Sequence, residues 1–323
     1  MCIIQCTSSR YANLIFFFFS IFAVLGLFAT LITTCIGYLV PAQRARAVDG
    51  LHGYNGFLVG MGIGYFDAQL TLERTDWVQF SRLLLPVFFT SVFCSLIHFV
   101  LSNMQSPPFT FAYNISLSCW LAFAVSLGPT SIFCPIFTSP RAPPVDNTIL
   151  IEYDSIDFGW FIQAVLAGVG QVFFAPELAS SIIILAGLSL GSPLIGLLCF
   201  SGSVVGTAVA VITHSVKWMT EQGFDGFSPV LAAVALGGFY FVPSGASFSY
   251  MIFGSVFCVA VRHVFAGLLV HTTGPAETFP FCFVATFMYL AAVTTGWPRM
   301  VPDKLLSYPE RHIGAPGQAS LDN

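Results

Sequence analysis

The chain has 323 residues, of which 56% are hydrophobic and only 8% are charged, and its formal net charge is −4. A soluble domain carries about 25% charged residues because its surface faces water, so this composition excludes an ordinary soluble protein. The thinly spread charge also excludes a nucleic-acid-binding surface. With a mean hydropathy of +0.84, the sequence predicts a polytopic membrane protein.

Charges, proline–glycine clusters and polar gaps divide the chain into apolar stretches. In chain order these are 12–40, 55–66, 83–102, 110–135, 158–174, 179–200, 203–217, 229–243, 247–271 and 278–296. A helix needs roughly 20 apolar residues to span a bilayer, and 55–66, 203–217 and 229–243 are shorter than that. Short stretches indicate broken or re-entrant helices, which are tolerated only inside protein or along a cavity. We expect about eight to ten spanning elements.

The ends of the chain carry weaker signals. The first stretch, 12–40, lacks a short apolar region followed by a cleavage site, so it is predicted to be a retained membrane segment. Arg299, Lys304 and Arg311 follow the last stretch, which favours a cytosolic C-terminus. The nine cysteines show no CxxC and no histidine–cysteine cluster at metal spacing. We therefore predict no metal site and no cofactor.

Two motifs occur twice in the same order. GLHGYNGFLVG at 50–60 is echoed by GFDGFSPVLAA at 223–233, with Gly53 aligned to Gly226 at a shift of 226 − 53 = 173. PPFTFAYN at 107–114 is echoed by PAETFPFC at 275–282, with Thr110 aligned to Thr278 at a shift of 278 − 110 = 168. Such a duplication predicts two homologous halves. Duplicated bundles place a transported solute where the repeats meet, beside discontinuous helices, so a channel or transporter is favoured.

The repeat defines the expected domain organisation. The first repeat covers 1–135, a linking loop 136–157, the second repeat 158–296 and a C-terminal tail 297–323. A full apolar stretch precedes the glycine–aromatic motif of the second repeat, whereas the first has only MCIIQCTSSRYANLIFFFFSIFAVLGL in that place. We therefore expect the N-terminal part of the first repeat to be missing or degraded.

One long stretch carries a family resemblance. GVGQVFFAPELASSIIILAGLSLGSPL, together with GLHGYNG, GFDGFSPVLAAVALGG, PPFTFAYN, TFPFCFVATFMYLAA and VPDKLLSYPE, resembles the urea transporter family over about residues 12–310. The resemblance implies an all-α fold of two inverted repeats, with a re-entrant pore helix and broken helices around a central pore. It also implies passive transport of urea and possibly its analogues, a homotrimer in the lipid bilayer and, as the expected location, the plasma membrane.

Urea chemistry defines what such a pore needs. Urea is planar and neutral, with four N–H donors and one carbonyl oxygen, and a desolvated polar group left unpaired costs a few kcal/mol. A flat slot with aromatic and leucine walls and a file of acceptors along its edges would meet these demands. No charge, metal or nucleophile is required, and no nucleic acid is expected as a partner.

The resemblance assigns residues to this slot. Gln171 would begin the pore helix and accept from urea N–H, and Phe174, three residues on, would form a wall on nearly the same helical face. The alternatives are a glutamine that bonds between helices and a core phenylalanine. Thr110 and Thr278 precede aromatic residues at repeat-related positions, where a hydroxyl both donates and accepts. The alternative is a hydroxyl that bonds to its own helix.

The glycine–aromatic motifs complete the slot. Tyr54 with Leu58, and Phe227 with Leu231, are each four residues apart and share a helical face. The resemblance makes them walls, and core packing is the alternative. Asn55 would stabilise broken-helix backbone. The glycines of the first motif are predicted to allow close backbone approach and to break the helix.

Several positions depart from the family pattern, and several polar residues are not expected to line the slot. Ala112 stands where the family has proline, and Ser228 where it has asparagine. The first pore-helix glutamine motif is absent, with Gln5 as a weak candidate. We expect His52 and Asp225 in a wetted vestibule, and Arg262 with His263 near an interface. We expect His98 and His214 to be satisfied core residues.

Three functions compete. The first is a passive urea channel without ion coupling. The second is a non-conducting or divergent family member that acts as a membrane subunit. The third, a membrane-embedded enzyme, finds no HExxH, no GxSxG and no intramembrane pair of carboxylates, so the chain is not expected to be an enzyme. An aquaporin is disfavoured by the lack of an Asn-Pro-Ala box, and an ammonium channel by the lack of aligned pore histidines.

Overall fold

The computed structural model describes residues 21–44, 47, 50, 52–71, 77–103, 106–127, 149–153, 156–269, 276–302 and 305–313. Their contacts form two units. One is drawn from Met1–Pro144 and Leu269–Glu277, and the other from Val145–Leu268 and Thr278–Asn323. Apart from two isolated β-bridges, the elements within these ranges are helices. The all-α prediction is therefore confirmed. Gln5 and Lys304 lie outside the described residues.

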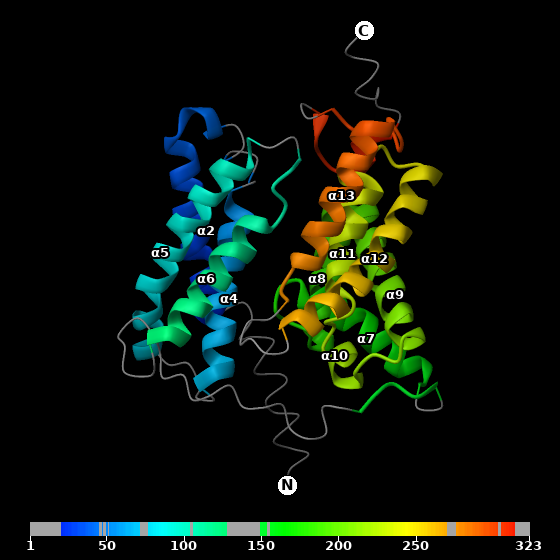
Figure 1. The fold of residues 1–323 in the computed structure, drawn as a ribbon, viewed down its shortest axis with the longest axis horizontal. Helices are drawn as coiled ribbons and strands as arrows, with labels where there is room; N and C mark the ends of the chain where they lie inside the picture. The colour runs from blue at the N-terminus through cyan, green and yellow to red at the C-terminus, as the bar shows by residue number, and fades with distance from the viewer. Residues whose placement is uncertain are drawn as a thin grey trace. The chain divides into compact units, whose positions relative to one another are not determined.

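The first unit is a bundle in which each helix is continuous between its described ends (Figure 1). Helix α4 packs along α2, and α5 contacts α2, α4 and α6. Its elements are α2 (Ile21–Leu39), η1 (Pro41–Gln43), α4 (Gly53–Thr71), α5 (Trp77–Leu101) and α6 (Phe111–Leu127).

The glycines of α4 form the face that packs on α2. A Cβ on Gly56 would lie 2.1 Å from Thr33 Oγ1, and a Cβ on Gly60 would lie 2.2 Å from the Leu25 carbonyl oxygen. Close backbone approach is thus observed, but the predicted helix break within the motif is wrong. Helix α4 is uninterrupted, and the bend precedes it at Gly50, whose φ is 80°. Only glycine adopts that conformation at no steric cost.

Replacing Gly60 with alanine should destabilise the protein by about 1–3 kcal/mol, because α2 and α4 must separate to admit the methyl group. Gly187 of the second unit is a matched control, since no heavy atom lies within 4 Å of a Cβ built there. Gly187→Ala should leave stability unchanged or slightly raise it. Thermal unfolding of the detergent-purified variants measures both, and equal melting temperatures would contradict the predicted clash.

The second unit contains more and shorter helices, shown in green to orange in Figure 1. They are α7 (Phe158–Gln171), α8 (Leu178–Gly191), α9 (Pro193–Ile212), α10 (Lys217–Glu221), α11 (Phe227–Val234), η4 (Ala235–Phe239), α12 (Gly245–Leu269), α13 (Phe279–Thr295) and α14 (Pro309–His312).

The predicted boundary between 179–200 and 203–217 is wrong, because the chain breaks at Ser192 instead. Pro193 cannot continue α8 but suits the first turn of α9. The Ser192 hydroxyl accepts from the Ile195 N–H at 3.1 Å and so caps α9. Glu310 of α14 accepts from that hydroxyl at 2.7 Å and from the Leu194 N–H at 2.8 Å. Burial raises the pKa of Glu310, but these hydrogen bonds outweigh it and the pKa falls below its usual value.

The predicted discontinuity at 229–243 is present as a change of helix type. Helix α11 passes directly into η4, a five-residue π-helix, a rare irregularity that often occurs at functional sites. The Ser247 hydroxyl donates to the Gly237 carbonyl at 3.2 Å, and the Ser255 hydroxyl donates to the Pro229 carbonyl at 3.3 Å. Hydroxyls of α12 thus donate to one carbonyl of α11 and one of η4.

Backbone geometry supports the proposed repeat. Gly50 and Gly223, which align at a shift of 173, have φ angles of 80° and 77°. Phe109 and Glu277, which align at a shift of 168, both have a φ of 43°. Left-handed conformations are uncommon for residues other than glycine. Their recurrence at aligned positions favours two halves with the same local fold, although the proposed domain boundaries remain a prediction.

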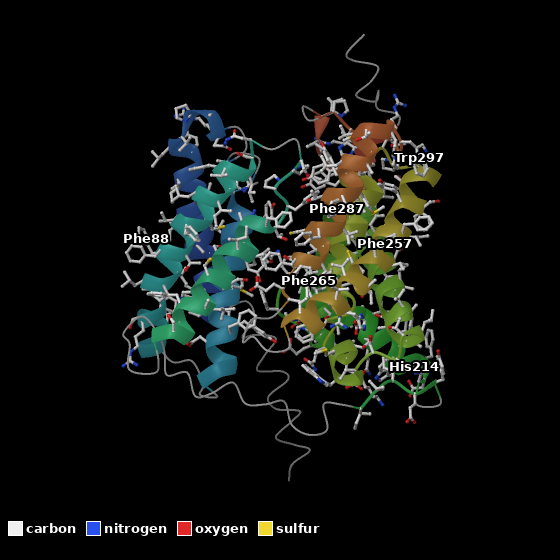
Figure 2. All side chains as sticks on the ribbon, viewed as in Figure 1. Phe88, His214, Phe257, Phe265, Phe287 and Trp297 are labelled. Atoms are coloured by element: carbon white, nitrogen blue, oxygen red, sulfur yellow. The ribbon has the colours of Figure 1, made fainter. Side chains whose placement is uncertain are left out.

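Within the described residues, four helices are long and apolar enough to cross a membrane. They are Phe22–Leu39, Phe80–Leu101, Pro193–Ile212 and Gly245–Leu268, and shorter apolar helices accompany them. Large apolar side chains on these helices are exposed, among them Phe88 of α5 and Phe257 of α12. Figure 2 shows Phe88 pointing away from its own unit. Exposure of this kind suits a surface whose solvent is lipid.

Candidate functional site

In the first unit, two neighbouring residues of α4 hold the start of α6. The Tyr54 hydroxyl donates to the Phe109 carbonyl, and Asn55 Nδ2 donates to the same oxygen at 3.2 Å. The Asn55 side-chain oxygen accepts from the Tyr113 N–H at 3.3 Å. Asn55 therefore satisfies one orphan donor in the first turn of α6 and one carbonyl in front of it. This matches the expected role of Asn55 in stabilising interrupted backbone.

The other candidates of this unit lie around that junction. Thr110 is buried directly before α6, and its carbonyl accepts from the Asn114 N–H at 2.9 Å. Leu58 is half-buried one turn after Tyr54 on α4. The structure therefore brings Tyr54, Asn55 and Thr110 to one helix junction.

In the second unit, Gln171 ends α7, so its predicted place at the start of a helix is wrong. The chain then turns, with the Phe174 N–H donating to the Gln171 carbonyl at 3.1 Å. Phe174 has a φ of 56° and lies outside the helix, so the shared-face argument for these two residues is also wrong. A Cβ on Gly170 would lie 2.2 Å from the Ala175 carbonyl oxygen. The turn therefore brings the backbone too close to Gly170 for any other residue.

Gln171 carries a free acceptor. Its side chain is only 6% exposed, and Oε1 makes no hydrogen bond within the described part of the chain. A buried acceptor without a partner costs about 1–3 kcal/mol. Native proteins rarely retain that cost unless a water or a ligand meets the group.

The remaining candidates lie on α11 and before α13. Phe227 opens α11 and is buried, Leu231 is half-buried one turn later, and Thr278 is buried directly before α13. Helix α11 contacts both α7 and α13, so Phe227 and Leu231 lie on the helix between those that carry Gln171 and Thr278.

The two halves differ at the junction that Asn55 closes in the first unit. Tyr54 is replaced by Phe227, which has no hydroxyl, and Asn55 is replaced by Ser228, whose buried hydroxyl makes no hydrogen bond to a described residue. The second half therefore retains unsatisfied hydrogen-bonding groups where the first half satisfies its own.

Sequence reasoning misjudged the charged residue at the second glycine motif. Asp225 is fully buried and forms an ion pair with Arg262 of α12, and it also accepts from the Thr220 hydroxyl at 2.6 Å. A wetted vestibule for Asp225 is therefore wrong, whereas the expected place of Arg262 near an interface stays a prediction. The sequence did contain a signal for this ion pair, because a charged residue such as Arg262 within an apolar stretch usually pairs with an opposite charge.

The aligned position in the first unit holds a histidine pair. His52 aligns with Asp225 at the shift of 173, is buried rather than wetted, and packs its ring on that of buried His98 with centroids 4.1 Å apart. His214 Nδ1 donates to the Ile151 carbonyl at 2.8 Å, and His263 Nε2 lies 3.0 Å from the Ser215 hydroxyl. Both of these histidines have partners, but His214 is exposed, so its predicted place in the core is wrong.

Long apolar helices, left-handed backbone positions that recur in both halves and buried hydrogen-bonding groups are typical of a polytopic membrane transport protein. The family model described as urea transporter matches residues 13–293. The chain belongs to the urea transporter family.

Curated relatives agree with this family. The chain is similar to urea transporter 1 of Ovis aries, with 26% identity over 296 residues that cover 90% of this chain and 73% of the relative. It is also similar to urea transporter 1 of Mus musculus, with 28% identity over 280 residues that cover 84% of this chain and 68% of the relative.

Proposed function

We propose that the protein carries urea across its membrane by passive, facilitated diffusion. Membership of a family of transporters, not of enzymes, supports this, and the buried Gln171 acceptor carries the assignment within the chain. An amide oxygen without a partner suits a solute that loses water and needs acceptors for its N–H groups.

The solute path in this proposal uses the residues assigned from the sequence. Gln171 accepts from urea N–H, and Thr110 and Thr278 bond urea through their hydroxyls. The apolar walls are Tyr54, Leu58, Phe174, Phe227 and Leu231. Asn55 takes no part in binding and holds the backbone in front of α6.

The setting completes the proposal. The chain works as a homotrimer in the lipid bilayer of the plasma membrane, with its C-terminus in the cytosol. Arg299 and Arg311, which follow the last apolar helix, support that orientation.

Stopped-flow urea flux into proteoliposomes tests the function. The protein should raise urea permeability above that of empty vesicles, with saturation, inhibition by urea analogues, and no change when sodium or proton gradients are removed. Flux that requires an ion gradient would show a coupled transporter. No flux from a folded, oligomeric preparation would show a non-conducting member of the family.

A further inference from the structure

Glu277 occupies the backbone position that Phe109 has in the first half. The two residues align at a shift of 277 − 109 = 168, share a φ of 43°, and each directly precedes the threonine of the proposed solute path. A left-handed backbone costs a non-glycine residue roughly 1–2 kcal/mol. The conformation therefore belongs to the motif, while the side chain changes from an aromatic ring to a carboxyl.

The Glu277 carboxyl is buried and has no hydrogen-bonding partner in the described part of the chain. The side chain is 7% exposed, and neither oxygen makes a hydrogen bond to a described residue. The Ser118 hydroxyl of α6 lies beside it but outside hydrogen-bond geometry.

Neither α6 nor α13 carries an acidic or basic residue. Their titratable groups are Tyr113 and Cys119 on α6, and Cys282 and Tyr289 on α13. A carboxyl in such surroundings is expensive to bury, and ionisable residues retained at membrane depth usually serve transport.

The carboxyl matches urea in either protonation state. As the neutral acid it donates O–H to the urea carbonyl and accepts from a urea N–H, and as the carboxylate it accepts from two N–H groups. Phe109 offers neither. We propose that Glu277 is a solute-binding residue that holds urea by two hydrogen bonds beside Thr278. This inference rests on the proposed function and adds to it a binding residue that is present in one half only.

Two near-isosteric substitutions test the proposal. Glu277→Gln keeps one donor and one acceptor, whereas Glu277→Met keeps the length and loses both. Urea permeability should stay within about threefold of wild type in the glutamine variant and fall roughly tenfold in the methionine variant. The methionine variant should melt at the same or a higher temperature, because an unpaired buried carboxyl has been removed. Glu177→Gln removes an exposed carboxylate and is the control for the loss of one negative charge.

Each other outcome has a definite meaning. Wild-type permeability in Glu277→Met would overturn the proposal. If Glu277→Met and Ser118→Ala both lost stability together with transport, the carboxyl would be a packing group, and the proposal would fail. A glutamine variant as slow as the methionine variant would refute the two hydrogen bonds. Absence of flux in wild type would refute the proposed function itself, which separates that failure from this one.

Discussion

Replacing Gln171 with leucine should lower urea permeability by roughly tenfold or more while the protein remains folded. Leucine is close to glutamine in size but offers urea no acceptor, so a desolvated N–H would lose a hydrogen bond in the path. The substitution should not reduce stability, because Oε1 makes no hydrogen bond to a described residue and its removal ends a desolvation cost. Stopped-flow flux and thermal unfolding of the same preparation measure the two effects.

Gln163 provides the matched control for this substitution. It lies on the same helix, α7, but is exposed. Gln163→Leu should leave urea permeability unchanged. If Gln171→Leu conducted like wild type, Gln171 would not contact the solute. If it instead melted at a markedly lower temperature, the glutamine would have a structural partner, and its assignment to the path would be wrong.

The fold was predictable to the level of helix content and repeat. Low charge and long apolar stretches require helices in lipid, and the doubled motifs aligned Gly50 with Gly223, which the structure shows to share a left-handed backbone. The boundaries of the helices were harder to predict from the sequence. Ser192 and Pro193 interrupt an apolar run whose hydropathy does not change, so only the capping geometry reveals the break. The glycines of α4 indicated close packing correctly but suggested a break that tertiary contact with α2 overrides.

The candidate site was predictable by residue type more than by geometry. The motif predicted that Asn55 stabilises backbone, and only the structure shows that this backbone is the start of α6. The position of Gln171 at a helix end did not follow, since a glycine-rich run before a glutamine fits either end of a helix. Glu277 was not predicted, because the repeat is recognised by the residues that both halves share, such as Thr110 and Thr278, whereas Phe109 and Glu277 differ.

The two glycine motifs stabilise their surroundings with different chemistry. The second half uses the Asp225–Arg262 ion pair, and the first half uses the contact between the tilted rings of His52 and His98. An ion pair in a buried site is costly to assemble but much costlier to leave half-made, because the remaining charge has no water around it. The second half therefore depends on both partners in a way that the first half does not.

Asp225→Asn should destabilise the protein by about 3–5 kcal/mol, because it leaves the Arg262 guanidinium buried without its counter-charge. Arg262→Met alone should cost a similar amount. The double variant Asp225→Asn with Arg262→Met should recover most of the loss, since no uncompensated charge remains. Thermal unfolding and the yield of monodisperse protein in detergent measure these changes.

The control is Glu221→Gln, which alters an exposed carboxylate that accepts from the Trp160 indole N–H at 2.8 Å. It should change the melting temperature and the yield little. Single variants as stable as Glu221→Gln, or a double variant no better than either single, would show that the pair contributes nothing to the fold.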